Sequence, residues 1–418
     1  RLAPTVGRPC GTDEPHPILH DWQRRIVAWA VTKGRAAIWA DTGLGKTFVQ
    51  LEWARLSGER ALIVAPLAVC HQTVREAARI GVTARYLRED DGQPGIVITN
   101  YEMCTRFDPD TFDAVCLDES SILKQHDGKT RNTIIAHFAG VRNRLSCTAT
   151  PAPNDPEELT SQAEFLGIMP RNEMLSAYFV NDEKSWRLKG HARTPMFQWM
   201  ATWAVAIRRP SDLGYEDGAY ELPPLDIIQQ TVEAEIDAPE GQLFAASLGG
   251  VGGRAAARKQ TLGARVARAA ELVAAEPAES WLIWCGLNDE ADQVAALIPG
   301  AVNVPGNWDP EAKAEAFLKF ADGDIRYLVT KPSIAAFGLN WQHCARMAFV
   351  GLGDSYEQYY QAIRRCWRYG QHRPVNAHVI VSRIEGSIAA NVSRKQRQAS
   401  NLTDGLVNVI RQNWKGQS

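Results

Sequence analysis

A glycine-rich turn that ends in a lysine and a threonine is the clearest chemical feature of the sequence. Residues 40–47 read ADTGLGKT and lie between an apolar run at 36–39 and a helix-like stretch at 48–56. Glycines let backbone N–H groups curl round a phosphate, Lys46 can reach its outer oxygens, and the hydroxyl of Thr47 can bind Mg²⁺. The sequence therefore predicts a nucleotide phosphate site. Its loop residues would be Thr42, Gly43, Gly45, Lys46 and Thr47.

Two carboxylates follow another apolar run. Residues 114–117 are apolar, and Asp118 and Glu119 come directly after them. Ligands of open α/β sheets bind at the carboxyl ends of the strands, which would place both carboxylates near the phosphate loop. Asp118 could hold Mg²⁺ through water, and Glu119 could orient and deprotonate an attacking water. Acid pairs at strand ends are also common as solvated turns, so this assignment depends on Lys46 and Thr47.

Two arginines in the second half could supply positive charge to the γ-phosphate. Residues 361–371 read QAIRRCWRYGQ, which predicts Arg365 and Arg368 three residues apart on one face of a helix. A neighbouring domain often contributes such charge, and hydrolysis then depends on domain closure. A surface basic helix without a catalytic role is the alternative.

The order of apolar runs predicts two α/β domains. Short apolar runs bounded by turn residues alternate with helix-length segments, which is typical of parallel sheets flanked by helices. The runs are 36–39, 61–65, 96–99, 114–117 and 145–148 in the first half, and 281–285, 301–304, 327–330, 347–350 and 377–381 in the second. We predict a lead-in over 1–17, a first domain over 18–208, an interdomain crossing over 209–224 and a second domain over 225–418.

Composition favours a cytoplasmic protein. A chain of 418 residues that is 45% hydrophobic can fill more than one core. Its eight cysteines show no CxxC pair, so we expect neither a disulfide scaffold nor structural zinc. No apolar run approaches the roughly 18 residues of a membrane span, and we expect no membrane partner.

Basic residues gather in two acid-free stretches, although the net charge is −2. Basic residues beside tryptophans suit a phosphate backbone and stacked bases. Solvated faces or interdomain pairing explain the stretches equally well. The first stretch has Trp186, Arg187, Lys189, Arg193, Trp199, Trp203, Arg208 and Arg209; the second has Arg254, Arg258, Lys259, Arg265 and Arg268.

Seven motifs in order resemble those of superfamily 2 helicases, and more narrowly the Swi/Snf-related branch. That branch ends its last motif in Arg-x-x-Arg-x-Gly-Gln, matched by Arg365, Arg368, Gly370 and Gln371. Within the branch the chain looks most like compact bacteriophage-encoded members. The motifs are ADTGLGKT at 40–47, APLAV at 65–69, ITNYE at 98–102, LDESS at 117–121, RLSCTATPAPN at 144–154, FGLN at 337–340 and QAIRRCWRYGQ at 361–371.

The resemblance implies two tandem RecA-like domains, each a mainly parallel sheet flanked by helices, with ATP and Mg²⁺ between them. It implies that Asp118 and Glu119 carry hydrolysis and that Arg365 and Arg368 act as arginine fingers. Nucleotide binding would also involve Gln23, at the adenine, and Gly338. The nucleic-acid track and its coupling to ATP would involve Pro66, Thr99, Tyr101, Thr148, Thr150, Thr330 and Asn340.

Two positions depart from the branch. Ser121 stands where relatives commonly have His, so their coupling through that His has no counterpart in the sequence. Residues 354–356, Asp-Ser-Tyr, replace a Trp-Asn-Pro run that relatives carry before the arginine segment.

We therefore expect a monomeric, nucleic-acid-stimulated ATPase that translocates on double-stranded DNA. Its mechanism would be cyclic closure of the two domains. One alternative is an RNA helicase or remodeller, because phosphate contacts barely distinguish DNA from RNA. Another is a nucleotide-gated nucleic-acid-binding module with weak hydrolysis. Ser121, which stands where relatives commonly have His, is the feature that favours this alternative.

Overall fold

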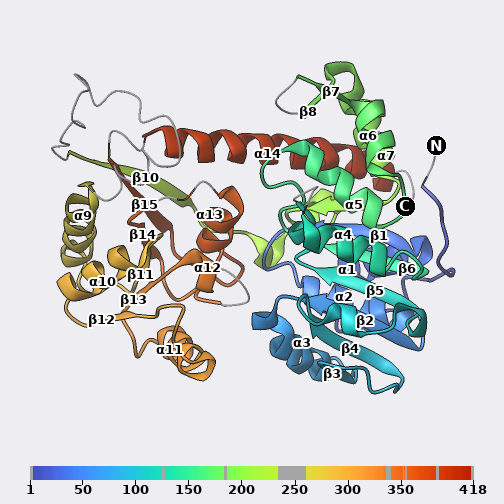
Figure 1. The fold of residues 1–418 in the computed structure, drawn as a ribbon, viewed down its shortest axis with the longest axis horizontal. Helices are drawn as coiled ribbons and strands as arrows, with labels where there is room; N and C mark the ends of the chain where they lie inside the picture. The colour runs from blue at the N-terminus through green and yellow to red at the C-terminus, as the bar shows by residue number, and fades with distance from the viewer. Residues whose placement is uncertain are drawn as a thin grey trace. The chain divides into compact units, whose positions relative to one another are not determined.

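The computed structural model describes residues 3–124, 128–182, 186–233, 260–335, 340–351, 353, 355–382 and 386–415. These residues form two compact units, Arg1–Tyr220 with Gln396–Ser418, and Glu221–Lys395. Each unit contains a parallel sheet flanked by helices (Figure 1). The predicted fold class, two α/β domains with mainly parallel sheets, is confirmed.

The sheet of the first unit has seven strands in the order β3-β4-β2-β5-β6-β1-β9, all parallel. They are β1 (Arg35–Ala40), β2 (Arg60–Ala65), β3 (Ala84–Tyr86), β4 (Gly95–Asn100), β5 (Ala114–Asp118), β6 (Asn143–Cys147) and β9 (Ala204–Ile207). The five predicted runs correspond to β1, β2, β4, β5 and β6. Strands β3 and β9 were not predicted, and β9 lies inside the first basic stretch.

Helices cover the sheet of the first unit, and a short antiparallel pair, β7 (Phe179–Asn181) and β8 (Trp186–Leu188), follows α6. The α-helices are α1 (Asp21–Lys33), α2 (Lys46–Leu56), α3 (Leu67–Arg79), α4 (Lys129–His137), α5 (Leu159–Phe165), α6 (Arg171–Tyr178) and α7 (Arg193–Met200). Single 3₁₀ turns are η1 (Cys104–Arg106), η2 (Pro109–Thr111), η3 (Ser120–Lys124), η4 (Pro156–Glu158), η5 (Gly190–Ala192), η6 (Pro210–Leu213) and η7 (Gly218–Tyr220).

The sheet of the second unit has six parallel strands in the order β10-β15-β14-β11-β13-β12. They are β10 (Leu225–Val232), β11 (Trp281–Trp284), β12 (Ala301–Asn303), β13 (Tyr327–Thr330), β14 (Arg346–Phe349) and β15 (Val375–Ser382). The helices are α9 (Leu262–Ala275), α10 (Asn288–Leu297), α11 (Pro310–Asp322), α12 (Pro332–Ala335) and α13 (Tyr356–Ile363). Strand β10 was not predicted, because at the sheet edge it mixes polar and apolar residues.

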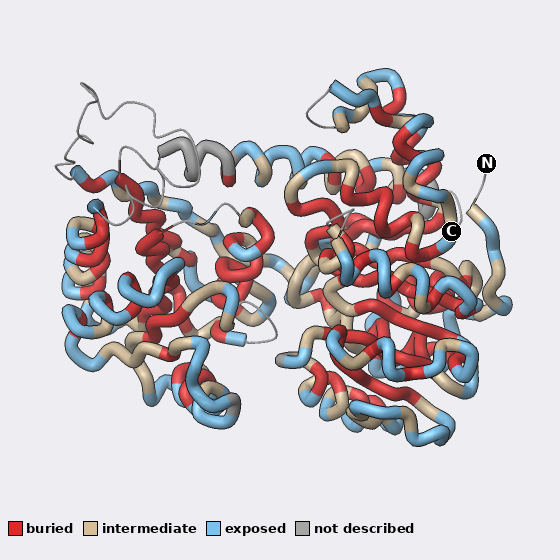
Figure 2. Tube along the Cα trace, viewed as in Figure 1, coloured by how far each residue is buried: buried red, intermediate tan, exposed pale blue. Residues whose placement is uncertain are grey.

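Burial explains why continuous apolar runs identified the central strands. Five of the six residues of β1 are buried, and so are five of the six in β2. A parallel strand covered on both faces has no solvent side on which polar residues could alternate. Figure 2 shows the same pattern, with buried residues running along the strands of each unit.

The last helix, α14 (Gly386–Lys415), connects the two units along the chain. Its later part packs on the first unit, where Leu402, Leu406 and Ile410 join the hydrophobic core. The division thus differs from the predicted second domain of 225–418, because residues 396–418 group with the first unit. None of the helices in the described part of the chain is long and apolar enough to cross a membrane.

The contact between α14 and α7 requires a glycine. A Cβ built on Gly405 would lie 2.1 Å from Cε2 of Phe197, a ring that is itself buried. Around this contact, Arg193 donates to the carbonyl of Asn401 and Arg411 forms an ion pair with Asp212.

We predict that Gly405→Ala destabilises the first unit by roughly 1–3 kcal/mol, because the extra methyl group overpacks a buried contact. The matched control is Gly263→Ala in α9, where an added Cβ meets no atom within 4 Å. That change should alter stability by at most about 1 kcal/mol, in the favourable direction set by helix propensity. Thermal unfolding of both variants measures the difference, and equal shifts would contradict the packing argument.

Candidate active site

The predicted phosphate loop joins β1 to α2, as the apolar run and the helical stretch indicated. Gly43 and Gly45 have φ angles of 90° and 70°, in the left-handed region that favours glycine. A Cβ on Gly45 would also lie 2.5 Å from Nε2 of Gln23. Conformation and packing therefore both require glycine at position 45, directly before the helix.

Lys46 is the first residue of α2, and its ammonium group lies over the loop. Its Nζ donates to the carbonyl oxygens of Ala40, at 2.7 Å, and Asp41, at 3.2 Å. The carboxylate of Asp41 in turn accepts from the backbone N–H of Thr42 at 2.7 Å. The cation is thus held inside the turn by neutral carbonyl groups, which an anionic phosphate can replace as its partner.

Gln23 connects α1 to the same loop. Its Nε2 donates to the carbonyl of Leu44 at 3.0 Å, and its Oε1 accepts from the N–H of His20 at 2.9 Å. The rings of His20 and Trp22 both lie edge-on to Tyr220, at centroid distances of 5.6 and 5.7 Å. Sequence reasoning missed this aromatic group, because Tyr220 falls in the predicted interdomain crossing.

Asp118 ends β5, which is separated from β1 by β6 alone. Its Oδ1 accepts from Nε2 of Gln50, one helical turn after Lys46, at 2.7 Å. Burial raises the pKa of Asp118, while the Gln50 hydrogen bond and the charge of Lys46 lower it. The structure therefore brings Lys46 and Asp118 into one electrostatic environment, and it adds Gln50, which no motif indicated.

Glu119 has an unusual backbone conformation. Its φ of 54° is the only positive value at a non-glycine residue in the described ranges. Its Oε2 accepts from the hydroxyl of Thr148 at 3.3 Å, and that hydroxyl accepts from the N–H of Thr150 at 3.1 Å. Strain of this kind, worth about 1–3 kcal/mol, is concentrated at functional positions. Glu119, Thr148 and Thr150, the two threonines for which we predict a coupling role, thus form one hydrogen-bonded group after β5 and β6.

A buried polar network begins at the next residue. The hydroxyls of Ser120 and Ser146 hydrogen-bond to each other at 2.9 Å, and Ser146 donates to Oε1 of Gln162 on α5. Nε2 of Gln162 donates to the carbonyl of Ser120 at 3.0 Å. All three residues are buried. The acid motif is therefore connected to the following motif through Ser120, whereas Ser121 bonds locally to the carbonyl of Glu119.

The arginine segment differs from its prediction. Helix α13 ends at Ile363, so Arg365 and Arg368 lie in the turns that follow it, and their assignment to one helix face is wrong. The physical reason is tertiary: Trp367 Nε1 donates to the carbonyl of Pro223 at 2.7 Å, and the guanidinium of Arg364 lies over the Trp367 ring.

Within these turns Arg365 is buried and held by Gln361. Its Nε donates to the carbonyl of Gln361 and its Nη2 to Oε1 of the same residue, both at 3.1 Å. Arg368 is half-buried. Gln371 fixes the end of the segment, because its Nε2 donates to the carbonyl of Cys344 at 3.0 Å.

Three predicted track residues have hydroxyls that bond within their own units. Thr99 donates to Leu87 O at 2.9 Å, Tyr101 to Asp118 O at 2.6 Å and Thr330 to Val304 O at 3.0 Å. All three are buried, so a contact with nucleic acid would use other atoms of these residues. Of the remaining predicted residues, Pro66 caps α3, Asn340 is exposed and Gly338 lies outside the described residues.

Two tryptophans of the first basic stretch are core residues, and Trp186 is partly buried against the same core. Trp199 and Trp203 are buried with ring centroids 5.4 Å apart, so base stacking by these two side chains is excluded. Arg208 and Arg209 pair with Asp404 and Asp217.

Arg265, in the second basic stretch, has a structural role. Its fully buried side chain pairs with Glu290 at 2.8 Å, so it cannot contact nucleic acid. The same glutamate accepts from the N–H groups of Gly286 and Leu287 at the start of α10. Arg254, Arg258 and Lys259 lie outside the described residues.

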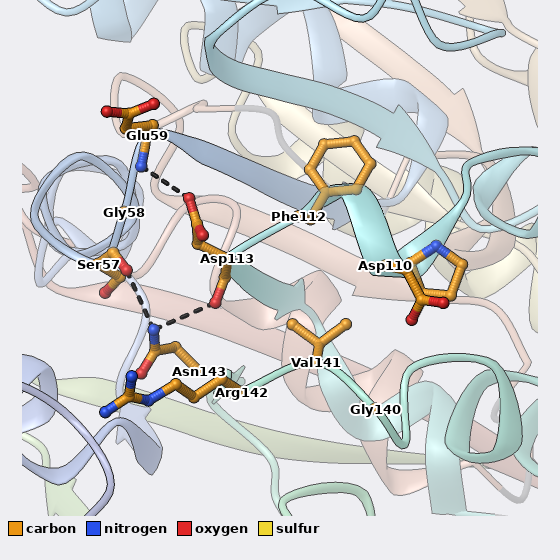
Figure 3. Close-up of a pocket in the computed structure, with 11 residues that line it drawn as sticks. Ser57, Gly58, Glu59, Asp110, Phe112, Asp113, Gly140, Val141, Arg142 and Asn143 are labelled. Carbon is orange, nitrogen blue, oxygen red and sulfur yellow. Dashed lines mark hydrogen bonds between the residues drawn. The ribbon is translucent and has the colours of Figure 1, made fainter.

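The pocket shown in Figure 3 lies at the opposite edge of the first sheet. Its volume is about 420 Å³, and it is lined by residues that precede β2, β5 and β6 and by Asn143, the first residue of β6. Oδ2 of Asp113 accepts from the N–H groups of Glu59 and Arg60, and Nδ2 of Asn143 donates to Ser57 O and Asp113 O. These bonds connect the loops at the amino ends of the strands, away from Asp118.

Known families match both units. Residues 15–182 match the SNF2-related domain, and residues 265–370 match the helicase conserved C-terminal domain. The chain contains these two domains in tandem. They are domains of nucleic-acid-dependent ATPases, and the chain is assigned to that enzyme class. The resemblance to Swi/Snf-related helicases is thus confirmed, whereas that to bacteriophage-encoded members stays a prediction.

A comparison with solved structures gives matches that include the following two. One is a fragment described as an HsdR subunit of a type I restriction enzyme from Vibrio vulnificus YJ016, with a TM-score of 0.60 and 14% identity. The match covers 90% of this chain and 66% of that fragment. The other is the SWI2/SNF2 ATPase core of Sulfolobus solfataricus in complex with double-stranded DNA, with a TM-score of 0.45 and 17% identity over 98% of this chain and 97% of that one. No curated protein matches the chain.

A buried carboxylate lies shortly after the motif at 144–154, at the last residue of η4. Glu158 accepts from the N–H and from Nδ2 of Asn154, at 3.0 and 2.8 Å. Burial nevertheless raises the pKa of Glu158 to about 7, against 4.5 for a free glutamate. The folded state therefore binds this proton more tightly than the unfolded state does.

We predict that the free energy of unfolding falls as the pH rises from about 4.5 to about 7 through this group. Glu158→Gln should remove roughly 1–3 kcal/mol of that pH dependence, because the neutral side chain no longer has to be deprotonated in a buried site. Urea unfolding at pH 5 and pH 8 measures it. Glu173→Gln, at an exposed residue of α6, is the control, and an unchanged slope in Glu158→Gln would refute the assignment.

Proposed function

We propose that this chain is an ATP-driven translocase on double-stranded DNA. The observation that carries the proposal is the gathering of Lys46, Asp118 and Glu119 at the carboxyl edge of the first sheet, within the SNF2-related domain. A glycine turn, a cation and two carboxylates at this edge are the groups that phosphoryl transfer to water requires.

The groups present fit ATP with Mg²⁺. Carboxylate and amide oxygens are the ligands that hard cations accept, and Gln50 beside Asp118 has a buried Oε1 to which no group in the described part of the chain donates. When bound, Mg²⁺ neutralises phosphate charge. Asp118 would hold it through water, and Thr47 would offer its hydroxyl.

The remaining roles belong to the protein's own side chains. Lys46 would exchange its two loop carbonyls for phosphate oxygens. Glu119, oriented by Thr148, would take the proton of the attacking water. Arg365 and Arg368, from the second domain, would meet the charge that develops on the γ-phosphate. Their approach would make hydrolysis depend on domain closure, and closure in each cycle would move the chain along the nucleic acid.

The preference for duplex DNA rests on the SNF2-related match, and an RNA-directed motor with the same engine is the alternative. Titration of the ATPase rate with duplex DNA, single-stranded DNA and RNA distinguishes them. We expect duplex DNA to stimulate most, with an effect that weakens as salt increases, because phosphate contacts release counterions. Stronger stimulation by RNA would favour the alternative, and hydrolysis that no nucleic acid accelerates would reject a motor.

We predict that Glu119→Gln lowers the nucleic-acid-stimulated kcat for ATP hydrolysis at least 10²-fold, the usual contribution of a general base. Nucleotide affinity should stay near its original value, since Lys46 and the loop are intact. Steady-state kinetics and a binding titration measure the two effects. Glu173→Gln is again the control, and turnover that survives in Glu119→Gln would exclude the assigned base.

A further inference from the structure

Gln50 is a side chain at the carboxyl edge of the first sheet whose chemistry no motif explains. It lies four residues after Lys46 on α2, so both side chains leave the same face of the helix. Only 1% of the residue is exposed, and its Nε2 donates to Asp118 Oδ1 at 2.7 Å. A buried amide is thus placed between the lysine turn and the carboxylate.

The direction of the amide follows from its partner. An ionised carboxylate only accepts hydrogen bonds, so the NH₂ group of Gln50 must face Asp118. Oε1 is then the remaining end of the amide, and it is buried without a hydrogen-bond partner among the described residues. A buried acceptor without a donor costs about 1–3 kcal/mol, so a donor that occupies this position stabilises the site.

We infer that Gln50 is a positioning residue of the metal site, which orients Asp118 and accepts a hydrogen bond from water bound to Mg²⁺. The inference rests on the proposed function. Water on a divalent cation is a polarised donor, and both Asp118 and Oε1 of Gln50 are acceptors beside the phosphate loop. The ammonium of Lys46 is already bonded to Ala40 and Asp41, so it does not supply this donor.

The neutral amide suits this position better than the alternatives. A carboxylate in place of Gln50 would repel Asp118, and an apolar side chain would remove the donor that offsets the burial of Asp118. Partners that orient metal-binding groups change metal affinity by 10–100-fold when they are removed.

The test is the Mg²⁺ dependence of ADP binding in Gln50→Met, which keeps the size of the side chain and removes both polar ends. Fluorescent ADP is titrated at zero and at saturating Mg²⁺. We expect Gln50→Met to reduce the Mg²⁺-dependent gain in affinity about tenfold, and to leave metal-free affinity within about twofold. Gln72→Met on α3, whose amide bonds to Glu76, is the matched control and should behave as the parent protein.

A second variant keeps the inference testable if Gln50→Met folds poorly. Gln50→Glu places two carboxylates together, so we expect a lower Tm without metal and a larger rise in Tm with Mg²⁺ and ADP than in the parent protein. A parental Mg²⁺ response in both variants would overturn the inference, as would equal loss of metal-free and Mg²⁺-dependent affinity. A parent protein that binds no ADP would instead overturn the proposed function, and the inference with it.

Discussion

The charge at the carboxyl edge of the first sheet is the constraint on which the candidate site depends. A carboxylate at the end of a buried strand tends to take up a proton, and the pKa of Asp118 is raised by burial for this reason. Two groups from α2 oppose that tendency: the amide of Gln50 donates to Asp118, and the ammonium of Lys46 lies close enough to favour its charged form. The helix that follows the glycine-rich loop thus also favours the charged form of Asp118.

Hydrogen bonds extend from this edge in two directions. Glu119 is held by Thr148, which also accepts from the backbone of Thr150. The following residue, Ser120, connects to Ser146 and Gln162 in a fully buried network. Relatives with His at position 121 are expected to couple through that side chain. In this chain the hydrogen bonds to the following motif begin one residue earlier, at Ser120, and use two hydroxyls and an amide. Such a buried network rigidifies a core only when all of its groups are satisfied.

Several charged residues in the described part of the second unit are held by contacts within that unit. Arg265 and Glu290 form a buried ion pair, and Glu290 also accepts a backbone N–H hydrogen bond before α10. Arg365 is oriented by Gln361, four residues earlier in the sequence. The charge runs visible in the sequence are therefore a poor guide to a nucleic-acid surface, because several of their members already have partners within their own unit.

Much of the fold and part of the site were determined by the sequence alone. Continuous apolar runs marked the central parallel strands, since both faces of such strands are buried, and glycines at 43 and 45 marked the loop because L side chains avoid its left-handed angles. Tertiary structure decided the features that depend on contacts between distant parts of the chain. The edge strand β10, the early end of α13 and the packing of α14 on α7 depend on partners far along the chain. Gln50 and Gln162 joined the candidate site only because folding brings them to Asp118 and Ser120. A hydrogen bond depends on the distance between two groups in space. Residue spacing in the sequence indicates only the periodicity within a single helix or strand.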